Sequence, residues 1–115
     1  MIQVTFFTDP TSPNRSYQGF TMRGHADTGP YGQDLVCCAA STLAIATVNA
    51  LSEVLKIEGI QVRSGEGKMD VFLPKKQTEE TIPYTDFALK TFVFNMKELA
   101  KDHPESIKIQ YRKDI

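Results

Sequence analysis

The sequence predicts a two-layer α+β domain, with two helices packed on one mostly antiparallel sheet. Short runs of alternating apolar residues, typical of strands, flank two longer segments with helical spacing. The expected element order is therefore β-β-α-β-β-α-β. A length of 115 residues suits one hydrophobic core, so we expect a single domain over residues 1–115.

The first two strands are expected to form a hairpin. Residues 2–7 are rich in β-branched and aromatic side chains, and a turn-forming stretch with two prolines follows at residues 9–14. Residues 17–23 then return as the partner strand. The hairpin leads into a glycine-punctuated segment, residues 24–34, which we expect to be a mobile active-site loop.

The first helix is expected over residues 35–57. Asp34 is a natural N-cap, which would make Cys37 the third helical residue. Gly59 lies just past the other end, where a left-handed residue commonly terminates a helix. Apolar or small residues recur with helical spacing at Val36, Ala40, Leu43, Ala50, Val54 and Ile57.

A second hairpin, a second helix and a closing strand complete the pattern. Two glycines mark the turn of the hairpin. The second helix has apolar residues three and four apart, and Phe87 and Phe94 are expected to widen its apolar face. These elements are expected at residues 60–63 and 68–73 for the strands, 82–101 for the helix and 107–112 for the last strand.

The composition excludes several classes of function. The 13 basic and 14 acidic residues give a net charge of −1, so the sequence carries no direct signal for nucleic-acid binding. No segment is expected to approach membrane-spanning length, because polar residues interrupt the apolar stretch 35–50. Cys37 and Cys38 are adjacent and cannot cross-link distant segments. Reduced thiols, together with an N-terminus that does not match a secretory leader, predict a cytoplasmic protein.

The strongest functional signal joins His25 to Cys37. The cysteine would lie over free N–H groups in the first helical turn, where a thiolate is favoured over a thiol. Loop glycines would let the imidazole approach the sulfur and act as its base. Ser41 lies one turn after Cys37 on the same helix face, and Asp34 could orient His25 as well as cap the helix. Cys38 points elsewhere and is expected to be a small buried residue.

The same residues admit simpler explanations. A cysteine in an alanine-rich helix is usually a packing residue, and a histidine in a loop is usually solvated. Adjacent cysteines do not match the spacing of a structural zinc site, so no metal is predicted. The loop glycines do not form a dinucleotide fingerprint, so no cofactor is predicted either. We expect these glycines to act as hinges of the loop, namely Gly24, Gly29 and Gly32.

The loop and the helix start together form a specific motif, which consists of Gly24-His25-Ala26, Gly29, Tyr31-Gly32, Asp34-Leu35-Val36-Cys37 and Ala40-Ser41. This motif resembles the signature of the bacterial ribosomal-processing cysteine protease family, Prp, whose length and element order are also similar. The resemblance implies that His25 and Cys37 form a catalytic pair, with Asp34 and Ser41 as supporting residues. It also implies a homodimeric endopeptidase that removes a short N-terminal extension from a large-subunit ribosomal protein.

Two other functions stay open at this point. The chain could be a ribosome-associated module that binds a peptide without cutting it, or a thiol redox sensor that uses both cysteines. The protease hypothesis assigns hydrolysis through an acyl-enzyme, with Cys37 as nucleophile, His25 as base, and a backbone N–H of Cys37 or Cys38 donating to the oxyanion. Family members often carry a small residue in place of Cys38, which leaves a redox role open.

Overall fold

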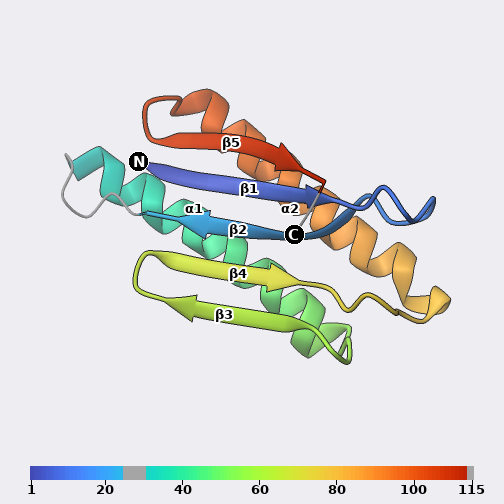
Figure 1. The fold of residues 1–115 in the computed structure, drawn as a ribbon. Coiled ribbons are helices and arrows are strands. Elements are labelled where there is room, and N and C mark those ends of the chain that lie inside the picture. Colours follow the sequence, from blue (N-terminus) through green and yellow to red (C-terminus); the bar gives the residue numbers. More distant parts are fainter. Residues whose placement is uncertain (25–30, 114–115) are drawn as a thin grey trace.

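The computed structural model describes residues 1–24 and 31–113, with residues 31–34 described by their backbone alone. A five-stranded sheet forms one layer, and both helices lie against the same face of it (Figure 1). This arrangement confirms the predicted α+β fold class and the order of strands and helices. The elements are β1 (Ile2–Thr8), β2 (Tyr17–Arg23), α1 (Tyr31–Asn49), β3 (Gln61–Gly65), β4 (Lys68–Phe72), α2 (Ile82–Asp102) and β5 (Ile107–Arg112).

The sheet is antiparallel except at one edge. Its strand order is β3-β4-β2-β1-β5, and only β1 and β5 pair in parallel. A parallel pair needs a long crossover, and α2 supplies it between β4 and β5. The two hairpins and this crossover therefore account for the whole topology.

The core lies between the sheet and the helices. Alternate residues of β1 face the helices, and Val4 and Phe6 have no exposed surface. On α2, Leu89, Phe92 and Met96 step by three and four and join the same buried cluster, as the spacing predicted. The Phe6 and Phe92 rings pack edge to face, with centroids 5.9 Å apart. Fully burying one such side chain contributes roughly 1.5–3 kcal/mol.

α2 matches the prediction at its ends but not on its outer face. It spans Ile82–Asp102, with Pro83 in the first turn, where the missing N–H costs little. The prediction that Phe87 and Phe94 widen the buried face is wrong, because 74% and 62% of these residues are exposed. Each lies two positions from a core residue, which is about 200° around a helix. Both rings therefore point to solvent.

The start of α1 also differs from the prediction. The helix begins at Tyr31, so Asp34 is part of its first turns and is not the N-cap. Cys37 is consequently the seventh helical residue and not the third. Pro30 was the usable signal in the sequence, because proline is common at the first positions of helices. Asp34, four positions after Pro30, has a side chain suited to capping but lies inside the helix.

The other end of α1 is looser than a regular helix. It continues past Asn49 as a π-helical turn, η1 (Ala50–Val54). The first left-handed residue after this turn is Lys56, with φ of 53°, and Gly59 follows with φ of 84°. The predicted helix end at residue 57 was therefore close, but Gly59 is not the residue that terminates the helix.

α1 also overturns the expectation that no segment reaches membrane-spanning length. By length and composition alone, Leu35–Val54 is long and apolar enough to cross a membrane, with a mean hydropathy of 1.8. In the fold, however, its inner face packs on the sheet, where Val36, Ala40 and Ala44 are at most 4% exposed. The inner face of this segment thus contributes to the core, while Leu35, Ile45 and Val54 are exposed.

Candidate active site

A cavity of about 340 Å³ lies between the first half of α1 and the hairpin formed by β3 and β4. Cys37 and Ser41 line it from α1, one turn apart, as their spacing predicted. Gly24 lines it from the end of β2. The opposite wall is made by the turn of the hairpin and its flanks, Ser64, Gly65, Glu66, Gly67, Lys68 and Met69.

Cys37 is partly buried at the wall of this cavity. Because α1 begins at Tyr31, the Cys37 N–H has a helical acceptor one turn earlier and is not one of the free amides of a helix start. The helix dipole also acts mainly within the first turn. A thiol held over free amides, and oxyanion donation from Cys37 or Cys38, therefore lose their physical basis.

Cys38 is exposed, and the prediction that it is a buried packing residue is wrong. It lies two positions after Val36, which is in the core, and two positions correspond to about 200° around the helix. Cys38 therefore faces solvent, while Cys37 lies on the cavity wall. The two thiols occupy different environments, as predicted, but Cys38 is the more accessible.

Gly24 holds the end of β2 in a conformation that only glycine adopts easily. Its φ is 87°, and its N–H donates a hydrogen bond to the Gly67 carbonyl at 2.9 Å. A Cβ at this position would collide with the Met1 carbonyl oxygen. Gly24 is thus an anchor between β2, the hairpin turn and the first residue of the chain, in addition to any part it plays as a hinge.

The other predicted site residues divide into two groups. His25 and Gly29 lie outside the described residues. Gly32 and Asp34 belong to α1 by their backbone, so residues 31–34 are helix and not loop. A helical Gly32 does not fit the predicted role of a hinge.

The hairpin turn opposite Cys37 was not predicted as part of the site. Its glycines mark a turn in the sequence, but only strand pairing places that turn near α1. Arg23 at the end of β2 pairs with Lys68 at the start of β4, which brings the Glu66-Gly67 turn beside Gly24. No local pattern reports this pairing, because it joins residues far apart in the sequence.

The described part of the cavity offers thiol chemistry. Cys37 contributes a thiol, and Ser41 and Ser64 contribute hydroxyl groups. Glu66 and Lys68 are the charged residues among those that line the opposite wall. Among the described residues, no three His, Cys, Asp or Glu side chains gather in a way that could hold a metal ion.

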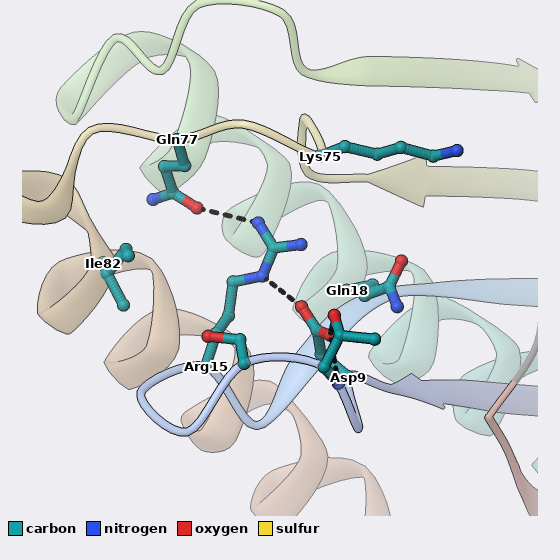
Figure 2. A pocket seen from close by; sticks show the side chains of 8 residues that line it. Asp9, Arg15, Gln18, Lys75, Gln77 and Ile82 are labelled. Atoms are coloured by element: carbon teal, nitrogen blue, oxygen red, sulfur yellow. Dashed lines mark hydrogen bonds and ion pairs between the residues drawn. The ribbon is translucent and has the colours of Figure 1, made fainter.

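A larger cavity, of about 570 Å³, lies at the opposite end of β1 and β2 (Figure 2). A buried ion pair, Arg15 to Asp9 at 2.8 Å, lies at its centre, and Arg15 also donates to the Pro74 carbonyl and the Gln77 side chain. Burial opposes ionisation of Asp9, but hydrogen bonds from Thr11 and Arg15 outweigh it and hold the pKa of Asp9 below its usual value. This network ties the β1–β2 connection to the segment after β4, which is a structural role.

Comparisons with known proteins identify a family of cysteine proteases. A family model described as cysteine protease Prp matches residues 1–108. Two similar relatives are both named ribosomal processing cysteine protease Prp. The one from Staphylococcus aureus is 26% identical over 92 residues, which cover 79% of this chain and 83% of the relative. The one from Bacillus subtilis is 23% identical over 110 residues, which cover 95% and 96%.

Solved structures share the fold. The crystal structure of SMU.848 from Streptococcus mutans matches with a TM-score of 0.80 at 28% identity, over 99% of this chain and 96% of that one. A structure of the S. aureus protein, described as an essential ribosomal processing protease in complex with a substrate peptide, matches with a TM-score of 0.79 at 23% identity. That match covers 97% of this chain and 100% of the other.

Proposed function

Because the chain belongs to the Prp family of cysteine proteases, we propose that it removes a short N-terminal extension from a large-subunit ribosomal protein. Membership of this family makes the chain a cysteine protease, which argues against the alternative of a module that binds a peptide without cutting it. The observation that supports a site in this chain is the cavity that joins Cys37 to Gly24, the residue before His25.

The first chemical step is attack by the Cys37 sulfur on the carbonyl carbon of the scissile bond. His25 accepts the thiol proton, and a tetrahedral oxyanion forms. Protonated His25 then donates that proton to the departing amine, which leaves as the new N-terminus of the ribosomal protein. Cys37 keeps the released extension as a thioester.

The second step is hydrolysis of this thioester. His25 removes a proton from a water molecule, the hydroxide adds to the carbonyl carbon, and the Cys37 sulfur leaves and regains a proton from His25. The extension departs as a carboxylate. Ser41 is the supporting residue that lies on the cavity wall next to Cys37, and we assign its hydroxyl as a donor to the oxyanion in both steps.

We assign the outer edge of β3 as the surface along which the substrate backbone binds. The Gly24 N–H donates to the Gly67 carbonyl, and the Leu73 N–H donates to the Gln18 carbonyl. Because these bonds flank the ladder between β2 and β4, the backbone groups of odd-numbered β4 residues face β2. Even-numbered residues of β4 then bond to β3, and the backbone groups of Val62 and Ser64 point away from the sheet. β3 is an edge strand, and Ser64 lies in the cavity wall. An extended peptide can therefore pair with β3 and reach Cys37.

The homodimer and the cytoplasmic location remain proposals. Tyr84, Phe87 and Phe94 form an exposed aromatic stripe on the outside of α2, between 62% and 74% exposed. We assign this stripe to contact between two copies of the chain. The proposed ribosomal substrate places the enzyme in the compartment where ribosomes assemble.

The function is tested with a synthetic peptide that spans the N-terminal extension and the first residues of the mature ribosomal protein. Mass spectrometry should find two products whose masses sum to that of the peptide plus one water. Cys37→Ser should lower kcat by about 10⁴-fold or more, because the thiolate is lost. Cys38→Ala is the matched control and should retain most of the activity. An equal loss of cleavage activity in both variants, or cleavage by Cys37→Ser at the parent rate, would contradict the assignment of Cys37 as the nucleophile.

Exposure of Cys38 is the one observation that favours the redox alternative. Adjacent helical side chains diverge by about 100°, however, so a disulfide between Cys37 and Cys38 would distort α1. The intact mass of the oxidised protein, measured with and without alkylation, separates the two functions. A reversible mass decrease of two hydrogens on oxidation, in a protein that does not cleave the peptide, would favour the redox sensor.

A further inference from the structure

The sheet face that is turned away from the helices has no helix or strand over it among the described residues (Figure 1). Directly paired residues of neighbouring strands point to the same side, so the side chains on this open face form three rows across the sheet. From the end near Gly24, the rows are Gly65, Lys68, Arg23, Gln3 and Lys108, then Arg63, Asp70, Thr21, Thr5 and Gln110, then Gln61, Phe72, Gly19, Phe7 and Arg112.

Positive charge is concentrated on the open face. The first two rows hold four basic side chains and one carboxylate, Asp70, which accepts a hydrogen bond from Arg23 at 2.6 Å. Among the described residues, Arg63, Lys68 and Lys108 have no ion-pair partner, and all three are exposed. The net charge of the entire chain is −1, so the excess negative charge lies on other surfaces. The overall charge therefore conceals a cationic face.

A hollow of about 500 Å³ lies at one corner of this face. Phe72 is one of its walls and is only partly buried. The ring of Phe7 reaches it across Gly19, which has no side chain, with ring centroids 5.2 Å apart. Arg63 and Lys75 also line the hollow. The hollow therefore combines an aromatic ring with two cations, and its one carboxylate, Asp70, is paired with Arg23. Such a lining suits a planar base attached to phosphates.

From these observations we infer that the open face of the sheet binds single-stranded RNA. The cationic rows hold the phosphates, and the hollow receives one unstacked base against Phe72. Neighbouring strands lie about 4.8 Å apart, so Lys68 and Arg23 in adjacent strands present charge at the scale of a nucleotide backbone. This binding function is separate from proteolysis and does not require the proposed protein substrate.

Other occupants fit the face less well. A second copy of the chain would place two surfaces of the same positive sign against each other. A membrane surface would need exposed apolar side chains around the cations, and the rows instead carry Gln3, Thr21 and Gln110. An acidic peptide matches the charge but leaves the aromatic hollow unused. Duplex RNA cannot offer a base to Phe72 without opening.

The test measures fluorescence anisotropy of a labelled single-stranded RNA of about 12 nucleotides, titrated with the full-length protein at about 50 and 200 mM salt. The parent should bind, and its affinity should fall steeply with salt. The double variant Lys68→Gln/Lys108→Gln should bind more weakly and lower the slope of log K against log salt by about 2. The matched control, Lys97→Gln/Lys101→Gln on α2, removes the same charge from another surface and should bind like the parent.

Phe72→Leu tests the hollow. It should weaken RNA binding about fivefold or more while the salt slope stays unchanged, because stacking and not charge is removed. Thermal melts of each variant establish that the sheet is intact, and binding by Cys37→Ser shows that the measurement does not depend on protease activity. Absence of parent binding up to about 100 μM at low salt, equal loss in the α2 control, or tighter binding of polyglutamate than of RNA would each overturn the inference.

Discussion

At the scale of single residues, Gly24 is the position where the structure demands one amino acid. Its positive φ, its hydrogen bond to Gly67 and the nearby Met1 carbonyl all exclude a side chain. The sequence predicted a hinge here, for which a substitution would reduce turnover more than stability. The contacts predict instead that folding and catalysis suffer together, because the strained residue also supports the cavity wall.

Gly24→Ala is therefore expected to lower the melting temperature by about 5 °C or more, because the left-handed conformation alone costs an alanine about 1–2 kcal/mol. Peptide cleavage should fall in parallel. Gly65→Ala is the control on the same cavity wall, since a Cβ there meets open space and should change the melting temperature little. Differential scanning fluorimetry and cleavage rates on both variants check this. A fully stable Gly24→Ala with slow turnover would restore the simple hinge.

At the scale of elements, the proposed pairing of the substrate with the outer edge of β3 can be tested without destabilising the fold. Val62→Pro removes an N–H that points away from β4, so the hairpin keeps its ladder. We expect the kcat/KM for the peptide to fall up to about 10-fold, as for one lost hydrogen bond, with little change in melting temperature. Arg63→Pro removes an N–H that faces Asp70 in β4, and it should destabilise the fold. Cleavage by Val62→Pro at the parent rate would mean that the substrate does not pair with β3.

The connection between β1 and β2 is held by the buried pair of Asp9 and Arg15. Asp9→Asn should lower the free energy of unfolding by about 3 kcal/mol at pH 7, because the Arg15 charge is left buried without its partner. Asp70→Asn, which breaks a pair with a half-exposed arginine, should cost less than about 1 kcal/mol. Chemical denaturation of both variants provides the comparison, and equal costs would contradict a special role for the buried pair.

The ion pair of Asp9 and Arg15 also makes the free energy of unfolding depend on pH. The pKa of Asp9 is lower in the folded than in the unfolded chain, so its contribution is fully present above the unfolded value of about 3.9. It is lost as the pH falls through the lower, folded pKa. The difference between the parent and Asp9→Asn should therefore shrink at acidic pH, and a constant difference from pH 7 to the acid transition would show that charge is not its source.

At the scale of the whole molecule, the fold was more predictable than the geometry of its site. Hydrophobic spacing gave the seven main elements, because the residues that bury themselves repeat with the period of the element. The spacing of core residues does not mark where α1 begins. Phe87 and Phe94 were expected on the buried face, although each lies about 200° around the helix from a core residue. The part of the site formed by Cys37 and Ser41 was predicted from one helical turn. The wall with Glu66 required the pairing of β4 with β2, which is a long-range property.

The outward-facing aromatic stripe on α2 leads to the prediction for the assembled molecule. Tyr84, Phe87 and Phe94 recur at helical spacing, and covering such a surface in a dimer removes apolar area from water. Phe87→Glu/Phe94→Glu should therefore shift the protein from dimer to monomer in light scattering after size exclusion, because two buried carboxylates would face each other without partners. Val54→Glu, at a residue that is 77% exposed on η1, is the control and should leave the dimer intact. A parent protein that is monomeric at all concentrations would rule out the dimer. Dissociation caused by Val54→Glu alone would mean that the dimer contact does not involve the aromatic stripe.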